Sequence, residues 1–345
     1  MTPAWLTIAL SRRLGDVSVD RVDVGPVAAG TNHRARVRVT YASGSGPASV
    51  FVKRHGRLGH RLALGVLGAL STEARLAESD EPLPIEHPLF YAGGADPRRL
   101  ATVVVMDDVL EGGGRPNDAR RALDVREVRA GLDELARLHA RYWDRRLPPG
   151  LEFLRPWRLG AAWSAVSALS LARGARRFQE RASDFVLPKG AGGRSLAEQF
   201  RASACRAASG TQTMLHGDPH PGNTYATATG GTGFYDWQLA RIGHWSHDVG
   251  YFLVGSLDVC ARRAHEHELL DSYLEALCRH GVPAGQAAGA WEHYRATPAF
   301  GLATWLHTLS FGTFQPVDVC LATIARFATA YEDLETSRST VARGA

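Results

Sequence analysis

Two short segments of the chain gather polar groups that could do chemistry. The turn-rich segment "LHGDPHPGN" at 215–223 holds two histidines, one aspartate and one asparagine, and "FYDWQ" at 234–238 places Asp236 at the end of an apolar run. Such groups serve metal-dependent hydrolysis, phosphoryl transfer, or hydrogen bonding that only shapes a loop. The other groups that the chain provides decide among these three.

A phosphoryl-transfer site needs a carboxylate to orient the attacking hydroxyl group, oxygen ligands for Mg²⁺ and a cation at the nucleotide phosphates. Asp218 could supply the carboxylate, and Asn223 and Asp236 carry oxygen atoms of the kind that Mg²⁺ prefers. Only two of the 40 basic residues are lysines, and one of them, Lys53, ends the strand-like run "VFVK". The sequence therefore contains every group that this chemistry requires.

The hydrophobic pattern changes from strand-like to helical along the chain. Alternating residues predict strands over 17–53, with a turn at 28–33, and an apolar run predicts a buried strand over 100–109. Apolar residues at helical spacing predict helices within 61–79, 130–144, 160–210 and 262–335. A carboxylate on the first of these helices, Glu73 or Glu78, is available to hold Lys53.

This pattern indicates an α+β fold with two lobes. We expect a β-rich N-terminal lobe (1–106), a hinge (107–113), a mostly α-helical C-terminal lobe (114–335) and a disordered tail (336–345). A chain of 345 residues with 45% hydrophobic and 22% charged residues is long enough to bury a core in each lobe.

Composition argues against several classes of protein. The net charge is only +5 and the basic residues of 151–206 are spread as on a solvated helical face, so we expect no nucleic-acid partner. Four cysteines without paired spacing indicate reduced thiols. No run approaches the ~20 apolar residues of a membrane span, and the N-terminal charges follow the apolar patch, unlike those of a signal peptide. We therefore expect a cytoplasmic protein.

The pattern H-G-D-x-H-x-x-N followed by Asp236 resembles the catalytic loop and metal-binding segment of the aminoglycoside phosphotransferase and choline kinase superfamily, which has the protein-kinase-like fold. The resemblance implies an ATP- and Mg²⁺-dependent enzyme in which Asp218 is the catalytic base. Asn223 and Asp236 would bind Mg²⁺. Lys53 would bind the phosphates of ATP in the N-terminal lobe, with Glu73 as its partner.

The resemblance also implies roles for residues around this centre. "VVVMDDV" takes the place of the hinge whose backbone binds adenine, at Met106, Asp107 and Val109. Asp248 is similar to the carboxylate that braces the catalytic loop, and His216 and His220 are expected to shape that loop through hydrogen bonds. The phrase "LARLHARYW" is similar to a helix of the ecdysteroid-kinase-like branch.

Two departures from the kinase pattern matter. The N-terminal lobe has no G-x-G-x-x-G loop, and only Gly30 in "AAGTNH" is available at the phosphates. After Asp236 the chain reads "WQLA", and only eleven residues separate Asp236 from Asp248. That interval is too short for the activation loop of a protein kinase, so the acceptor is expected to be a small molecule.

Other interpretations meet the sequence less well. A metallophosphoesterase would need a further Asp-x-His upstream of Asp218-Pro-His220, and the chain has none. A P-loop enzyme would need Ser or Thr after a lysine, and neither lysine has one. A catalytically silent, kinase-like nucleotide-binding module remains open, since a fold does not establish activity.

The clues to the acceptor come from one aromatic stretch of the sequence. The stretch 291–314 is rich in aromatic residues and holds a single carboxylate, Glu292. These aromatics either line an acceptor pocket or form helix core. In the first case they favour a hydrophobic alcohol as the acceptor over an aminoglycoside, which would need several carboxylates. An aminoglycoside 3'-type phosphotransferase remains the alternative.

Overall fold

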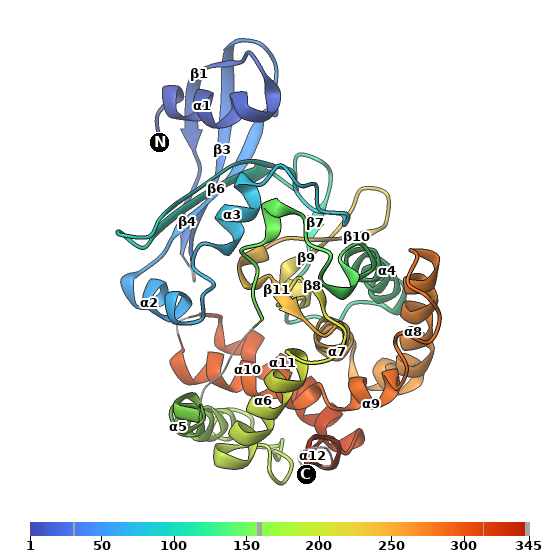
Figure 1. The fold of residues 1–345 in the computed structure, drawn as a ribbon. Coiled ribbons are helices and arrows are strands. Elements are labelled where there is room, and N and C mark those ends of the chain that lie inside the picture. The colour runs from blue at the N-terminus through green and yellow to red at the C-terminus, as the bar shows by residue number, and fades with distance from the viewer. Residues whose placement is uncertain (30–31, 157–160, 313, 342–345) are drawn as a thin grey trace.

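The computed structural model describes residues 1–29, 32–156, 161–312 and 314–341, which form a sheet-rich lobe and a helical lobe (Figure 1). The strands are β1 (Ser18–Val24), β2 (Ala28–Ala29), β3 (Asn32–Ser43), β4 (Ser49–His55), β5 (Phe90–Asp96), β6 (Ala101–Asp107), β7 (Arg115–Pro116), β8 (Thr213–Leu215), β9 (Thr224–Ala226), β10 (Thr232–Phe234) and β11 (Arg241–Gly243). The helices are α1 (Pro3–Leu14), α2 (Leu58–Val66), α3 (Thr72–Glu78), α4 (Val125–Arg141), α5 (Ala161–Gln179), α6 (Gly193–Ala207), α7 (Ser246–Ser256), α8 (Val259–Arg279), α9 (Ala290–Arg295), α10 (Pro298–Phe311), α11 (Val317–Asp333) and α12 (Thr336–Val341). Short 3₁₀ helices are η1 (Trp143–Arg145), η2 (Pro149–Leu151), η3 (Pro221–Asn223) and η4 (Trp237–Leu239).

The N-terminal lobe is an antiparallel sheet in the order β1-β3-β4-β6-β5, with β2 paired to β3. Alternation along the strands sends valines such as Val37, Val50 and Val105 to one face, where Leu6 and Leu10 of α1 cover them. The other face of β4 carries Lys53, which is only 5% exposed. The strands predicted over 17–53 are therefore present, and their alternation puts Lys53 on the face away from α1.

The helix expected within 61–79 is two helices instead of one. α2 ends at Val66, and Gly68 then adopts a φ of +68°, a left-handed conformation that favours glycine, before α3 begins at Thr72. The break matters because it lets the two helices pack against different parts of the molecule. α3 packs beside β5, whereas α2 lies toward α10 of the other lobe (Figure 1).

The C-terminal lobe is helical, with a three-stranded sheet (β10-β9-β7) and the strand pair β11-β8 near its junction with the N-terminal sheet (Figure 1). α4 begins earlier than the predicted 130, because Asp124 and Glu127 form a capping box at its N-terminus. α10 is apolar nearly all round and packs against α5, α6, α7 and α11, as expected for a central helix. β8 and β11 pair antiparallel and frame the segment 216–240 that carries the site.

The tail differs from the sequence expectation. Residues Thr336–Val341 form a helix, where a disordered segment was expected, because the Thr336 side chain is buried and donates a hydrogen bond to the backbone oxygen of Arg295. Residues 342–345 lie outside the described part of the chain. All four cysteines are free, as expected from their spacing. No helix within the described ranges has the length and apolarity to cross a membrane.

Candidate active site

Lys53 is buried between two carboxylates. Its Nζ lies 2.6 Å from Oε2 of Glu73 on α3 and 2.5 Å from Oδ1 of Asp236. Burial would lower the pKa of Lys53, but the two carboxylates outweigh it and raise that pKa, so the side chain stays charged. Glu73 therefore fills the position that the sequence left open between two glutamates.

Asp236 has an unusual backbone conformation. Its φ and ψ of 67° and 63° are left-handed, which costs a residue other than glycine about 1–3 kcal/mol. Two contacts hold the segment in place: Trp237 N donates to Glu73 Oε1 at 3.0 Å, and Asn32 Nδ2 donates to Gln238 Oε1 at 2.9 Å. Both contacts come from residues of the sheet lobe, so that lobe holds the turn at Asp236 in its left-handed conformation.

Asp248, at the start of α7, holds the backbone of the loop that carries Asp218. Its carboxylate accepts hydrogen bonds from His216 N at 2.6 Å and from Gly217 N at 3.0 Å, and His139 Nε2 lies 3.4 Å away. Gly217 has a φ of +90°, and a Cβ there would lie 2.0 Å from the Leu239 backbone oxygen. Only glycine fits, which explains the residue before Asp218 in the motif.

Asp218 faces the space between the lobes and has a perturbed carboxyl group. Burial, with the nearby Asp236 carboxylate, raises the pKa of Asp218 to about 7. Asn223 Nδ2 donates to Asp218 Oδ2 at 3.1 Å and to its backbone oxygen at 2.9 Å. The Tyr251 hydroxyl and the Arg241 charge stabilise the ionised form. A carboxyl group with such a pKa can exchange a proton near neutral pH.

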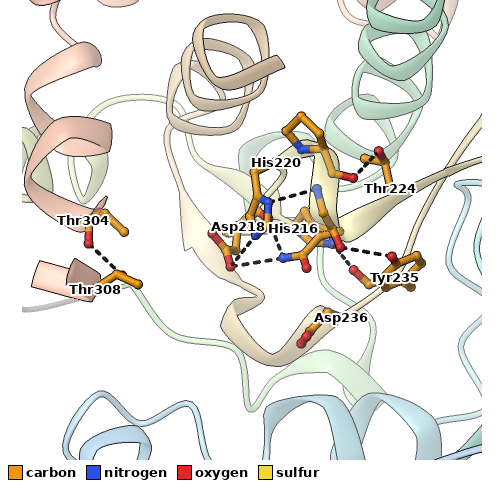
Figure 2. A network of polar contacts seen from close by, with 12 residues as sticks. His216, Asp218, His220, Thr224, Tyr235, Asp236, Thr304 and Thr308 are labelled. Atoms are coloured by element: carbon orange, nitrogen blue, oxygen red, sulfur yellow. Dashed lines mark hydrogen bonds and ion pairs between the residues drawn. The ribbon is translucent and has the colours of Figure 1, made fainter. Parts of the chain in front are cut away.

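The two histidines of the loop form hydrogen bonds within it and to the segment just before Asp236 (Figure 2). His216 Nδ1 accepts from Asp218 N at 3.3 Å and its Nε2 lies 3.2 Å from the Tyr235 backbone oxygen, while His220 Nδ1 accepts from Gly222 N at 3.1 Å. Burial lowers the pKa of His220 to about 4, so its ring is neutral at pH 7. Both rings stabilise the loop geometry.

The donor set suits a magnesium ion bound together with phosphates. The amide nitrogen of Asn223 is used on Asp218, which leaves its amide oxygen for a cation beside the Asp236 carboxylate. Mg²⁺ takes one or two protein oxygens and completes its octahedron with phosphate and water. Within the described ranges no group of three or more His, Cys, Asp or Glu is placed to hold a metal alone. The residues therefore fit a metal that arrives with a nucleotide.

Two cavities meet at Asp236, which lines both. The first, of about 140 Å³, is lined by Lys53, Glu73 and the end of β6, including Met106, Asp107 and Val109. The structure thus brings the expected hinge residues to the same cavity as Lys53. Gly30, the expected phosphate-loop glycine, lies outside the described residues.

The second cavity, of about 350 Å³, opens on the other side of Asp236 and contains Asp218, His220 and Asn223 in its wall. Its remaining lining comes from α2, α6, α7, α10 and the residues around η4 and after α10: Ala63, Leu64, Leu67, Phe200, Gln238, Leu239, Tyr251, Thr304, Trp305, His307, Thr308, Phe311, Phe314 and Gln315. Figure 2 shows Thr304 and Thr308 of α10 bonded to each other, near the loop with Asp218. The aromatic stretch 291–314 therefore divides, because the end of α10 lines a cavity while Phe300 is core.

Sequence reasoning missed several residues of the site. Tyr251 follows Asp248 by three positions on α7, so helical spacing could have placed it on the same face. Arg241 donates from Nη1 to the Gly217 backbone oxygen at 2.8 Å, because β11 pairs with β8 just before the loop. His139 of α4 also contacts Asp248, with its Nε2 atom 3.4 Å from Oδ2. No local signal marked the contribution of α2.

Comparisons with known proteins agree with this two-lobed architecture. A family model described as "Phosphotransferase enzyme family" matches residues 24–296. The choline kinase of Cryptosporidium parvum Iowa II is similar, with a TM-score of 0.51 and 13% identity over 91% of this chain and 89% of that chain. A spectinomycin phosphotransferase, solved with ADP and spectinomycin, has a TM-score of 0.50 and 14% identity over 95% and 99%. A search of curated proteins finds no match. At these identities the solved structures show the fold, and the predicted two-lobed, protein-kinase-like fold is confirmed.

Proposed function

Because the chain belongs to the phosphotransferase enzyme family, we propose that it transfers the γ-phosphoryl group of ATP to a hydroxyl group of a neutral, largely apolar small molecule. The observation that carries this proposal is the position of Asp236, in the wall of both cavities. A nucleotide in the first cavity and an acceptor in the second would meet there, with Asp218 on the acceptor side.

The residues divide the work in this proposal. Lys53, held by Glu73, binds the phosphates, and Asn223 with Asp236 holds Mg²⁺, which when bound neutralises phosphate charge. Asp218 orients the acceptor hydroxyl and takes its proton as the new O–P bond forms and the bond from the γ-phosphorus to ADP breaks. Positioning and charge neutralisation supply most of the rate in such a reaction.

The lining of the second cavity favours a neutral acceptor. Its only carboxylates among the described residues are Asp218 and Asp236, and both already have roles in the transfer. A polycationic aminoglycoside would bury several ammonium groups there without partners, which is costly. Side chains such as Leu64, Trp305 and Phe314 instead offer apolar contact, and Thr308 and Gln315 offer a few polar groups. This balance suits a hydrophobic alcohol.

The proposal is tested by measuring ADP formation from Mg²⁺-ATP across a panel of acceptors. The panel contains neutral hydrophobic alcohols (sterols and long-chain alcohols), simple sugars, choline and aminoglycosides. We expect acceptor-dependent turnover with at least one hydrophobic alcohol and none with kanamycin-type aminoglycosides. Turnover with aminoglycosides or choline alone would contradict the neutral acceptor, and ATP binding without turnover on any acceptor would favour a silent module.

A further inference from the structure

β3 brings two arginines to the face of the sheet that lines the first cavity, which is proposed to bind the nucleotide and is called the nucleotide cavity below. Arg34 and Arg36 are two positions apart on the strand, so both side chains lie on one face, and both line the cavity that contains Lys53. Arg34 is also the register partner of Lys53 on β4. Partners in an antiparallel pair have Cβ atoms about 5 Å apart, so the two side chains start side by side on one face of the sheet.

The two arginines differ in what they bind. Arg36 Nε forms an ion pair with the buried carboxylate of Asp108, which also accepts from Ser49 Oγ at 2.6 Å. Arg34 has no hydrogen bond or ion pair from its side chain to any residue in the described ranges. Its charge is felt by Asp236, whose pKa is lowered mainly by Lys53 and further by Arg34 against the effect of burial. Arg34 is thus a half-buried cation at the site with capacity to bind a ligand.

The net charge of the groups around Lys53 indicates that a further cation is needed to bind phosphates in this cavity. Lys53 already contacts two carboxylates, Glu73 and Asp236, so this group of three carries a net negative charge. A nucleotide triphosphate remains negative even with one Mg²⁺ bound, and it would enter a cavity that repels it. Protein kinases cover the phosphates with the backbone of a glycine-rich loop, and this sequence has no G-x-G-x-x-G.

We propose that Arg34 binds the phosphate chain of the nucleotide beside Lys53 and supplies by its side chain what a glycine-rich loop supplies by its backbone. This proposal rests on the nucleotide-binding part of the proposed function. A guanidinium group presents its N–H donors in a planar fork that matches two phosphate oxygens, which an ammonium group cannot do. Since Arg34 lies beside Lys53 and not beside the hinge, its contribution grows with the number of phosphates.

The test compares dissociation constants of AMP, ADP and ATP, measured by calorimetry with Mg²⁺ present, for the wild type and Arg34→Gln. We expect Arg34→Gln to weaken ATP binding about 10- to 100-fold and to leave AMP binding unchanged, because only the longer phosphate chain reaches the guanidinium. Arg34→Lys should recover part of the loss. The control is Arg54→Gln, because Arg54 is the exposed neighbour of Lys53 on the opposite face of β4 and should not affect any of the three.

Two outcomes would overturn the assignment of Arg34 alone. In one, Arg34→Gln binds ATP as tightly as the wild type does. In the other, AMP and ATP weaken by the same factor, which would mean that Arg34 only supports the structure of the cavity. A wild-type protein that binds none of the nucleotides would overturn the proposed function, and this proposal with it.

Discussion

The cavities on the two sides of Asp236 are built in opposite ways. On the nucleotide side, charged groups contact one another directly, as Lys53 contacts Glu73 and Asp236. On the acceptor side, aliphatic and aromatic side chains from several elements, α2 and α10 among them, contribute much of the wall. Loss of one charged partner leaves another buried without compensation, whereas loss of one apolar contact is shared by its neighbours. Substitutions should therefore have steep effects on the first side and graded effects on the second.

The largest effect is expected at the carboxylate of the acceptor cavity that would accept the proton. Asp218→Asn keeps the size and hydrogen-bonding shape of the side chain but removes the proton acceptor, so turnover should fall by about 10² to 10⁴. ATP affinity should be nearly unchanged, because Asp218 lies in the wall of the acceptor cavity. ADP formation and calorimetry measure the two quantities.

The control for this variant is Asp184→Asn, an exposed carboxylate in the loop after α5. It should leave both quantities unchanged. Full turnover by Asp218→Asn would mean that another group accepts the proton.

The next effect sharpens the charged side of the comparison. Lys53→Met removes the cation between Glu73 and Asp236, so ATP affinity should fall about 100-fold and the free energy of unfolding by about 3–5 kcal/mol. Chemical denaturation measures the second quantity.

The chain offers a matched control, because its only other lysine, Lys189, is exposed. Lys189→Met should change neither ATP affinity nor stability. If Lys53→Met and Lys189→Met behave alike, Lys53 is not the phosphate-binding residue.

A smaller, graded effect is expected on the apolar side. Leu67→Ala and Phe314→Ala each remove apolar surface from the acceptor cavity, so each should raise the KM of the acceptor about tenfold and leave the KM of ATP unchanged. Leu62→Ala is the control, because Leu62 is exposed and does not line that cavity. An increase in the KM of ATP of the same size would show that these residues serve the nucleotide instead of the acceptor.

The smallest effect concerns stability and pH. The folded-state pKa of Asp218, about 7, lies above the ordinary value of 3.8, so the folded protein binds more protons than the unfolded chain between these values. Asp218 therefore lowers stability as pH rises through this window. Asp218→Asn should melt about 2–4 °C above the wild type at pH 8, with little difference at pH 4. An equal difference at both pH values, by thermal melting without ligands, would contradict the raised pKa.

The sequence points to the polar and charged groups of the site where their signals are local. Asp218 and Asn223 are five positions apart in one loop, so a motif of nine residues is enough to identify both. Lys53 is conspicuous because the chain has only two lysines. It pairs with Glu73 and not with Glu78, because the α3 helix turns Glu73 toward it. The resemblance to known phosphotransferases then assigned roles to these residues.

The apolar side depends on packing between segments far apart in the chain, which no local pattern reveals. α2 reaches the acceptor cavity because Gly68 ends one helix and redirects the next, and a continuous helical pattern over 61–79 conceals this break. The aromatic stretch around α10 carries the same composition whether it is core or cavity wall. The two cases are separated only by the cavity that Trp305 and Phe314 line together with Asp218. The role proposed for Arg34 likewise depends on its register with Lys53, which only the structure shows.

The most direct test of the proposal is a competition experiment with mass-spectrometric detection of the products. The protein, Mg²⁺ and ATP are incubated with an equimolar mixture of hydrophobic alcohols, choline and aminoglycosides, with Asp218→Asn as the control. We expect a single class of product, a hydrophobic alcohol that has gained one phosphoryl group, and no such product with Asp218→Asn. Phosphorylated aminoglycoside or choline as the only product, or equal product from Asp218→Asn, would contradict it.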